Sequence, residues 1–155
     1  MFPDDLIKTA RGLVNLDQNS HGQANLKRAL STAYYAMFHA LCRNCADSFV
    51  GTEEDNRSQR AWEHAYRVLD HKPTKNRCND QEFKRSFPEG VQDFARKFIE
   101  LQEKRHDADY NPSYTLTSND VLNDIGIAEI AIKKLNSAAI KDKRAFAVWT
   151  AFGKR

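Results

Sequence analysis

Apolar residues recur at helical spacing along almost the whole chain. The clearest stripe runs through Phe83, Phe87, Val91, Phe94, Phe98 and Leu101, at intervals of four, four, three, four and three residues. These intervals place the six side chains on one face of an α-helix. No stretch alternates apolar and polar residues as a strand would, and no internal repeat is visible. The pattern predicts an all-α protein, a bundle of four to five helices in up-down order.

Short polar segments separate the expected helices. A break is expected at residues 19–22. Pro88 either kinks the helix that carries the phenylalanine stripe or marks its start near Phe87. Thr117 and Ser118 are plausible N-caps for the last helix. The expected helices cover residues 3–16, 23–47, 60–71, 83–101 and 121–135, and the expected loops cover residues 51–59, 71–80 and 106–117.

The last expected helix is apolar over a wide arc. Such a helix either lies at the centre of a bundle or faces a partner subunit. Together with the phenylalanine stripe, this arc is more apolar surface than one thin bundle readily covers, so we expect a homodimer. The residues of the arc are Val121, Leu122, Ile125, Ala128, Ile132 and Leu135.

Composition narrows the class of protein. The 155 residues are 41% hydrophobic and 29% charged, which is typical of one soluble globular domain. No apolar run is long enough to span a membrane, and the acidic N-terminus does not resemble a signal peptide. The three scattered cysteines form no disulfide framework. We therefore expect a cytoplasmic protein.

The formal charge of +3 is concentrated in the tail, since residues 141–155 hold five cations and one acid. Phe146, Trp149 and Phe152 lie among these cations. Single-stranded nucleic acid binds to cations, which contact its phosphates, and to aromatic rings, which stack on its bases. On this interpretation, Lys143, Arg144 and Trp149 bind nucleic acid. Alternatively, the aromatic stripe docks on the bundle or on a second subunit. We divide the chain into a bundle, residues 1–138, and a basic-aromatic extension, residues 139–155. The charged residues of the tail are Lys141, Asp142, Lys143, Arg144, Lys154 and Arg155.

Arg105 occupies the next position of the phenylalanine stripe, where the pattern calls for a core residue. Burying an unpaired guanidinium costs free energy, so Arg105 requires a carboxylate, a phosphate or a water-lined crevice. The alternative is an arginine that extends to solvent at the end of its helix, where positive charge suits the helix dipole.

A second polar line crosses the long helix at residues 23–47. Arg28, Thr32, Tyr35 and His39 recur at intervals of four, three and four among alanines and leucines. They either border a crevice shared with Arg105 or form the solvent-facing side of the helix.

Motifs for metal or cofactor binding are weak. Cys42 and Cys45 form one CxxC pair, and Cys78 and His71 lack ligand-like spacing to it. The chain also lacks a glycine-rich phosphate loop and the common hydrolase motifs. We expect neither a metal nor a cofactor.

Two segments together resemble the HEPN superfamily. Residues 27–42, KRALSTAYYAMFHALC, resemble its second helix, and residues 103–112, EKRHDADYNP, resemble a later segment in which arginine precedes "ADY". The stretch Trp62–Val68 with His64 lies where many relatives carry a histidine. The resemblance covers about residues 1–138. It implies a helical bundle that pairs into a dimer with a cleft between the protomers.

Nuclease members of this superfamily carry an arginine followed four to six residues later by histidine and cut RNA without metal. Other members partner a nucleotidyltransferase. Arg105 matches the arginine, but Tyr110 stands where the histidine is expected. His39, His64 or His106 would then have to move the proton. Arg28, Tyr35 and Asp109 are expected to line the same cleft.

The sequence thus leads to two functional hypotheses. The first is an RNA-binding or RNA-cleaving HEPN-like dimer of a prokaryotic defence or toxin–antitoxin system, a metal-independent endoribonuclease if it is an enzyme. The second is a non-catalytic dimerisation or interaction module that partners a nucleotidyltransferase or another effector.

Overall fold

The prediction of an all-α protein is confirmed. The computed structural model describes residues 2–16 and 18–154, with the backbone alone for residues 18–21, and contains no strand within them. Arg155 lies outside the described residues. This part holds eight α-helices where about five were expected, and a 3-10 turn (η1) at Glu54–Asn56. The helices are α1 (Pro3–Val14), α2 (Gln18–Val50), α3 (Gln59–Tyr66), α4 (His71–Cys78), α5 (Gln81–Ser86), α6 (Glu89–Tyr110), α7 (Ser118–Asn136) and α8 (Ile140–Ala151).

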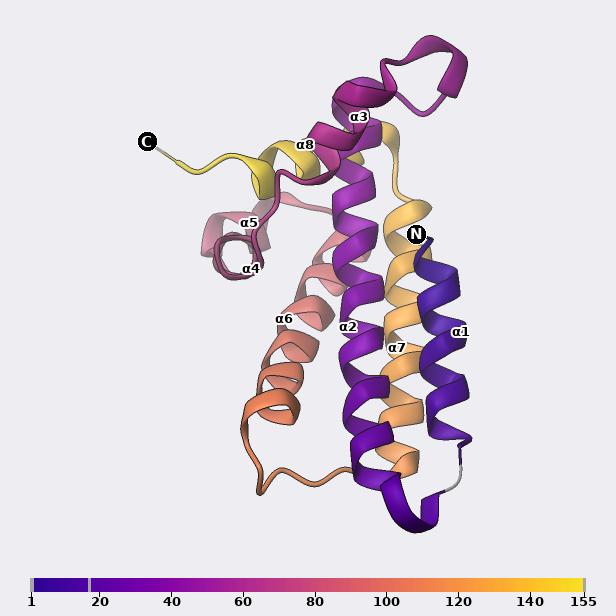
Figure 1. The fold of residues 1–155 in the computed structure, drawn as a ribbon. Helices are drawn as coiled ribbons and strands as arrows, with labels where there is room; N and C mark the ends of the chain where they lie inside the picture. Colours follow the sequence, from indigo (N-terminus) through magenta and orange to yellow (C-terminus); the bar gives the residue numbers. More distant parts are fainter. Residues whose placement is uncertain (1, 17, 155) are drawn as a thin grey trace.

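Four of these helices, α1, α2, α6 and α7, pack lengthwise and alternate in direction (Figure 1). The longest, α2, contacts each of the other three. Its contact face is lined by small residues, among them Ala29, Ala33, Ala36 and Ala40, all at most 5% exposed. Because alanine side chains are short, neighbouring helices approach α2 closely, and α2 becomes the axis of the fold.

The short helices α3, α4, α5 and α8 gather toward the end of the molecule where α2 finishes (Figure 1). Helices α3 and α8 pack on α2, while α4 packs on α6 and α8. The side chain of Phe146 anchors α8, because it is fully buried against Phe83, Phe87 and Phe94. The aromatic stripe of the tail therefore docks on the bundle in this structure.

Two expected breaks are helical. Residues 71–80 were expected to form a loop, but α4 begins at His71. Pro73 lies in the first turn of α4, where a missing N–H breaks no intrahelical hydrogen bond, and burial of Thr74 and Cys78 fixes the helix in place. The break expected at residues 19–22 is also absent, since α2 begins at Gln18 and accommodates Gly22 in its interior.

Other helix ends match their sequence signals. Thr117 caps α7 as predicted, with its hydroxyl accepting a hydrogen bond from the Asp120 N–H at 3.2 Å. Pro88 is the residue before α6, so the phenylalanine stripe belongs to two helices rather than to one kinked helix. Helix α6 continues to Tyr110, past the expected start of the loop at residue 106. Arg105 therefore lies inside a helix, with a full turn after it.

The described helices do not include one that combines the length and the hydrophobicity needed to cross a bilayer.

Candidate functional site

Arg105 lies in the angle between α6 and α2, as its place on the apolar stripe suggested. Its side chain is 14% exposed, and its Cζ atom lies 5.0 Å from the centroid of the Tyr34 ring and 5.9 Å from that of Tyr35. Both rings come from α2. A guanidinium over an aromatic face is stabilised by the ring quadrupole, by about 0.5–2 kcal/mol. The two tyrosines therefore replace part of the hydration that Arg105 loses on burial.

The hydrogen-bonding capacity of Arg105 is largely unused. One Nη atom lies 3.4 Å from the Asp109 carboxylate, one turn further along α6, and the buried Nε has no hydrogen-bond partner in the described structure. The other oxygen of Asp109 accepts a hydrogen bond from Ser31 of α2 at 2.8 Å. Since a guanidinium carries five N–H donors, Arg105 retains donors for an external anion.

A histidine that the sequence did not single out for this site completes it. His71, the first residue of α4, places its Nδ1 atom 2.6 Å from the hydroxyl of Tyr34. Its ring stacks on Phe38 at 3.9 Å and meets Tyr35 edge-on at 5.9 Å. Gln102 of α6 donates a hydrogen bond to the His71 backbone carbonyl at 3.3 Å. Tyr34 and Tyr35 thus each contact both Arg105 and His71.

The electrostatics of this group favour a neutral imidazole. Burial lowers the pKa of His71, and the positive charge of Arg105 lowers it further. Burial also raises the pKa of Tyr34 well above its usual range, so this hydroxyl keeps its proton. A protonated hydroxyl donates to the lone pair of an imidazole nitrogen. We infer that Tyr34 donates to Nδ1 and that neutral His71 carries its proton on Nε2.

His39 forms a second tyrosine–histidine pair further along α2. Its Nδ1 atom lies 2.6 Å from the hydroxyl of Tyr66 in α3, and burial lowers its pKa. Burial raises the pKa of Tyr66 to about 12. The Phe38 ring stands between the two pairs, 3.9 Å from the His71 ring and 6.3 Å from the His39 ring. A row of rings therefore extends along α2 from Tyr35 to Tyr66.

Several predicted site residues lie elsewhere. Tyr110 is 69% exposed, and its ring contacts only that of His106, at 4.9 Å, among the described aromatic contacts. His64 lies on the exposed side of α3, beside Arg60 and Arg67. Of the three residues proposed to replace the missing histidine, His39 is the one whose ring contacts Phe38, on which His71 stacks.

The polar line on α2 is only partly shared with this group. Tyr35 contacts both Arg105 and His71, whereas Arg28 is exposed and interacts through its carbonyl oxygen, which accepts a hydrogen bond from Thr32 at 2.8 Å. The line therefore contacts the Arg105 and His71 group at Tyr35 and faces solvent at Arg28.

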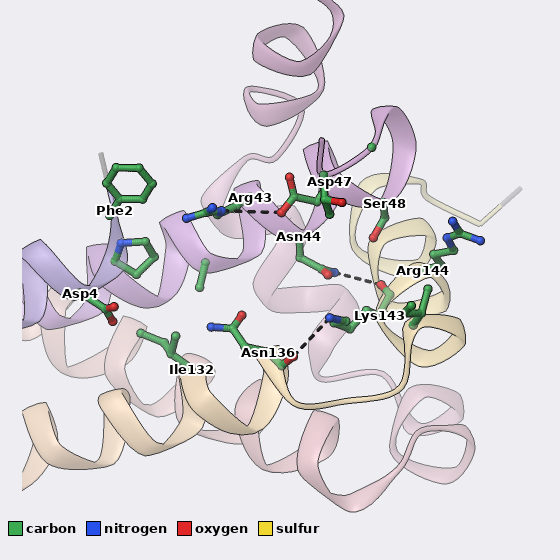
Figure 2. A pocket seen from close by; sticks show the side chains of 15 residues that line it. Phe2, Asp4, Arg43, Asn44, Asp47, Ser48, Ile132, Asn136, Lys143 and Arg144 are labelled. Atoms are coloured by element: carbon green, nitrogen blue, oxygen red, sulfur yellow. Dashed lines mark hydrogen bonds and ion pairs between the residues drawn. The ribbon is translucent and has the colours of Figure 1, made fainter. Parts of the chain in front are cut away.

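The predicted binding residues of the tail are far from Arg105 in the fold. Lys143 and Arg144 line a separate cavity where α8 begins, close to the ends of α2 and α7 (Figure 2). Trp149 is partly buried, and its indole N–H donates to the Arg77 carbonyl of α4 at 2.9 Å. Whether these three residues bind nucleic acid stays a prediction.

The cysteines are part of the core. Cys42, Cys45 and Cys78 are free and buried, and burial raises their pKa values to about 12, 11 and 12, respectively. Thiols with such pKa values are protonated and unreactive at neutral pH. In the part of the chain that the structure describes, no three or more His, Cys, Asp or Glu side chains are grouped to hold a metal ion.

Sequence reasoning missed His71 and Tyr34. His71 was considered only as a remote metal ligand, because residues 71–80 were taken as a loop. The signal that would have found it is Asp70, an acceptable N-cap residue, directly before a segment with buried positions at Thr74 and Cys78. Tyr34 stands beside Tyr35 in the segment that resembles the HEPN superfamily, but only its full burial gives it a partner.

Comparison with known proteins identifies no relative of this chain: no protein-family model, curated protein or solved structure matches it. The resemblance to the HEPN superfamily therefore rests on the two segments that carry it, and function has to be argued from the residues of the site.

Proposed function

We propose that this protein is an RNA-directed, HEPN-like protein that binds a phosphate of single-stranded RNA at Arg105 and uses His71 as the proton-transfer group for metal-independent cleavage. The observation that carries the proposal is the state of Arg105. It is mostly buried, yet among the described residues its one charged partner is Asp109 at 3.4 Å, and its Nε has no hydrogen-bond partner. A guanidinium desolvated in this way gains most from a charged acceptor such as phosphate.

The surroundings of Arg105 favour an anionic ligand. Helix α4, which begins at His71, carries Lys72, Lys75 and Arg77 and no Asp or Glu. This positive excess beside the site attracts the phosphate backbone by long-range electrostatics. The Nε2–H group of His71 supplies a second hydrogen-bond donor next to Arg105.

The ring row supports binding of unpaired bases. Tyr35 is 36% exposed, and the Phe38 ring is partly buried beside it. Stacking on aromatic side chains contributes about 1–3 kcal/mol per base and tolerates any base. A base next to the phosphate held by Arg105 would stack on Tyr35, which favours single-stranded RNA over a duplex.

The chemistry requires no metal. The 2′-oxygen attacks the adjacent phosphorus, the bond to the 5′-oxygen breaks, and a 2′,3′-cyclic phosphate forms. Arg105 stabilises the negative charge that develops on the phosphorane. Protonated His71 gives its Nε2 proton to the leaving 5′-oxygen, while the proton of the 2′-hydroxyl passes to water. Because the pKa of His71 is lowered, cleavage should increase as the pH falls below about 6.5.

The remaining parts of the proposal rest on the resemblance of residues 27–42 and 103–112. They are a homodimer whose protomers face each other across the Arg105 site, a role in a prokaryotic defence or toxin–antitoxin system, and a cytoplasmic location. The exposed Tyr110, at the end of α6, would then be available to stack on RNA or to contact the second protomer.

The test uses labelled single-stranded RNA with a chelator from pH 5 to 9, and follows cleavage by gel and binding by fluorescence anisotropy. We expect cleavage by the wild type that is lost in Arg105→Leu and His71→Asn. His64→Asn and His106→Asn are the matched controls, because both histidines are exposed and outside the site. If the wild type binds the RNA without cleaving it, the protein is an RNA-binding protein and the cleavage part of the proposal is wrong. If the folded wild type neither binds nor cleaves the RNA, the whole proposal is refuted.

The second candidate is a non-catalytic interaction module that partners a nucleotidyltransferase or another effector. The bond between Tyr34 and His71 favours it, since together with burial it holds the imidazole as a neutral hydrogen-bond donor rather than as an acid. A nucleotidyltransferase gene next to this one, with no RNA decay after the purified protein is added, would favour this candidate over the first.

A further inference from the structure

A cavity of about 610 Å³ lies between the start of α1, the end of α2, the end of α7 and the start of α8. Figure 2 shows Phe2 and Asp4 at one end of it and Lys143 and Arg144 at the other, with Arg43 and Asn44 of α2 between them. A volume of this size is typical of sites for small organic ligands, which occupy about 300–1,000 Å³.

The charge of the cavity is positive once its ion pairs are taken into account. Arg43, Lys143 and Arg144 line it, against Asp4 and Asp47. The Asp47 carboxylate is shared, because Arg43 and a second arginine outside the cavity, Arg57, each place a nitrogen 3.6 Å from its oxygens. It also accepts the indole N–H of Trp62 at 2.9 Å. One carboxylate divided between two arginines leaves positive charge facing the cavity.

The hydrogen-bond donors at the end of the cavity lined by Lys143 and Arg144 are available to a ligand. Lys143 uses one N–H on the Asn136 carbonyl at the end of α7, at 3.2 Å, and its ammonium group keeps two further donors. Its backbone carbonyl accepts from Asn44 at 3.0 Å, which fixes α8 beside α2. Arg144 has no hydrogen bond or ion pair within the described residues, nor has the hydroxyl of Ser48, which also lines the cavity.

The end of the cavity where Phe2 and Asp4 lie offers an aromatic ring to a ligand. The Phe2 ring is 58% exposed, and the Arg43 guanidinium lies 5.1 Å from its centroid. Pro3, Ile132 and Ile140 complete the apolar lining. An exposed ring beside a guanidinium offers a stacking surface to a planar group.

We propose that this cavity binds a small phosphomonoester whose attached group is flat and apolar. Lys143 and Arg144 hold the phosphate dianion, Ser48 donates a further hydrogen bond, and the planar group lies against Phe2 and Arg43. The site is separate from the Arg105 site and does not depend on the RNA function proposed above.

The experiment is a calorimetric titration of the full chain at low salt with phenyl phosphate, with inorganic phosphate and benzyl alcohol as the two partial ligands. We expect saturable binding of phenyl phosphate, weaker binding of inorganic phosphate and none of benzyl alcohol. Arg144→Gln and Lys143→Gln should each weaken binding about tenfold or more, because each removes a charged hydrogen bond. Phe2→Ala should weaken the binding of phenyl phosphate but not that of inorganic phosphate.

Two matched controls remove a positive charge elsewhere. Arg60→Gln changes an exposed arginine of α3, and Arg96→Gln changes an exposed arginine of α6; neither should alter binding of phenyl phosphate. Melting curves identify variants that fail to fold, and Arg144→Gln is the decisive variant because Arg144 has no partner to lose. The proposal is wrong if the wild type shows no saturable binding, if either control weakens binding as much as Arg144→Gln does, or if a single-stranded RNA with hydroxyl ends displaces phenyl phosphate.

Discussion

The hydroxyl of Tyr34 lies 2.6 Å from Nδ1 of His71, and the same tyrosine ring lies beneath the guanidinium of Arg105 at 5.0 Å. One fully buried side chain of α2 thus contacts the first residue of α4 and a residue near the end of α6. Tyr34 fixes the orientation of the imidazole through its hydroxyl and that of the guanidinium through its ring. Substitutions of Tyr34 can therefore separate the contact with His71 from the contact with Arg105.

Removing the hydroxyl separates these two roles. In Tyr34→Phe the ring still packs on Phe98 and beneath Arg105, but Nδ1 of His71 loses its donor. We expect a loss of about 0.5–1.5 kcal/mol in the free energy of unfolding, and a change in the ¹⁵N shifts of the His71 ring toward a mixture of tautomers. The control is Tyr35→Phe, at a partly exposed ring. Unchanged His71 nitrogen shifts in Tyr34→Phe would show that the bond does not set the tautomer.

The lowered pKa of His71 predicts a pH dependence of stability. Its pKa is below the ordinary value of 6.5 in the folded protein and returns to about that value on unfolding. The unfolded chain therefore binds more protons as the pH falls below 6.5, and the free energy of unfolding decreases in that range. Above pH 6.5 this contribution is constant. Urea unfolding from pH 5 to 8 should show a smaller decrease in His71→Gln and the wild-type decrease in the exposed-site variant His106→Gln.

Much of the fold was predictable because local rules and packing agree. The part of the phenylalanine stripe that lies on α6 and the Thr117 cap each follow from spacing or capping chemistry, and each is present. Arg105 was recognisable as an anomaly for the same reason, since it interrupts a regular apolar pattern at a position that proves to be mostly buried.

The rest depended on contacts between distant segments. Helix α4 has a polar sequence with a proline in its first turn, and packing of Thr74 and Cys78 against other helices outweighs that local signal. His71 reaches the site only because α4 forms where it does. Tyr110 marks the expected catalytic position in sequence, yet it is 69% exposed at the end of α6, where its ring contacts that of His106.

Replacing Arg105 with leucine should remove RNA binding without unfolding the protein. The guanidinium is mostly buried with one weak ion pair, so an apolar side chain of similar volume in its place is expected to be neutral or stabilising. The melting temperature should be unchanged or higher, while the affinity for labelled RNA falls at least tenfold. Arg96→Leu is the matched control, because Arg96 is an exposed arginine of α6. RNA binding at wild-type strength in a folded Arg105→Leu protein would exclude Arg105 from the site.

The docking of α8 predicts a large effect at Phe146. This side chain is fully buried among Phe83, Phe87 and Phe94, so Phe146→Ala should cost about 3–5 kcal/mol of unfolding free energy. Val148→Ala, two residues further on and 50% exposed, should change stability by less than about 0.5 kcal/mol. Chemical denaturation measures both. Equal, small effects would mean that α8 is not part of the cooperative unit.

Dimerisation is the last prediction, and it tests the wide apolar arc of α7. Much of that arc is buried within the protomer, but Leu122 remains 39% exposed, and Ile130, which was not part of the arc, is 56% exposed. If these residues face a second copy, light scattering at micromolar concentration should give about twice the chain mass of 17.8 kDa. Ile130→Glu should then give a monomer with unchanged helix content, because a charge in a symmetric interface meets its own copy or an apolar neighbour. Val148→Glu, which places the same charge at a similarly exposed position on α8, should leave the dimer intact. A mass of 17.8 kDa for the wild type would refute the dimer, and a dimer that withstands Ile130→Glu would place the interface on another face.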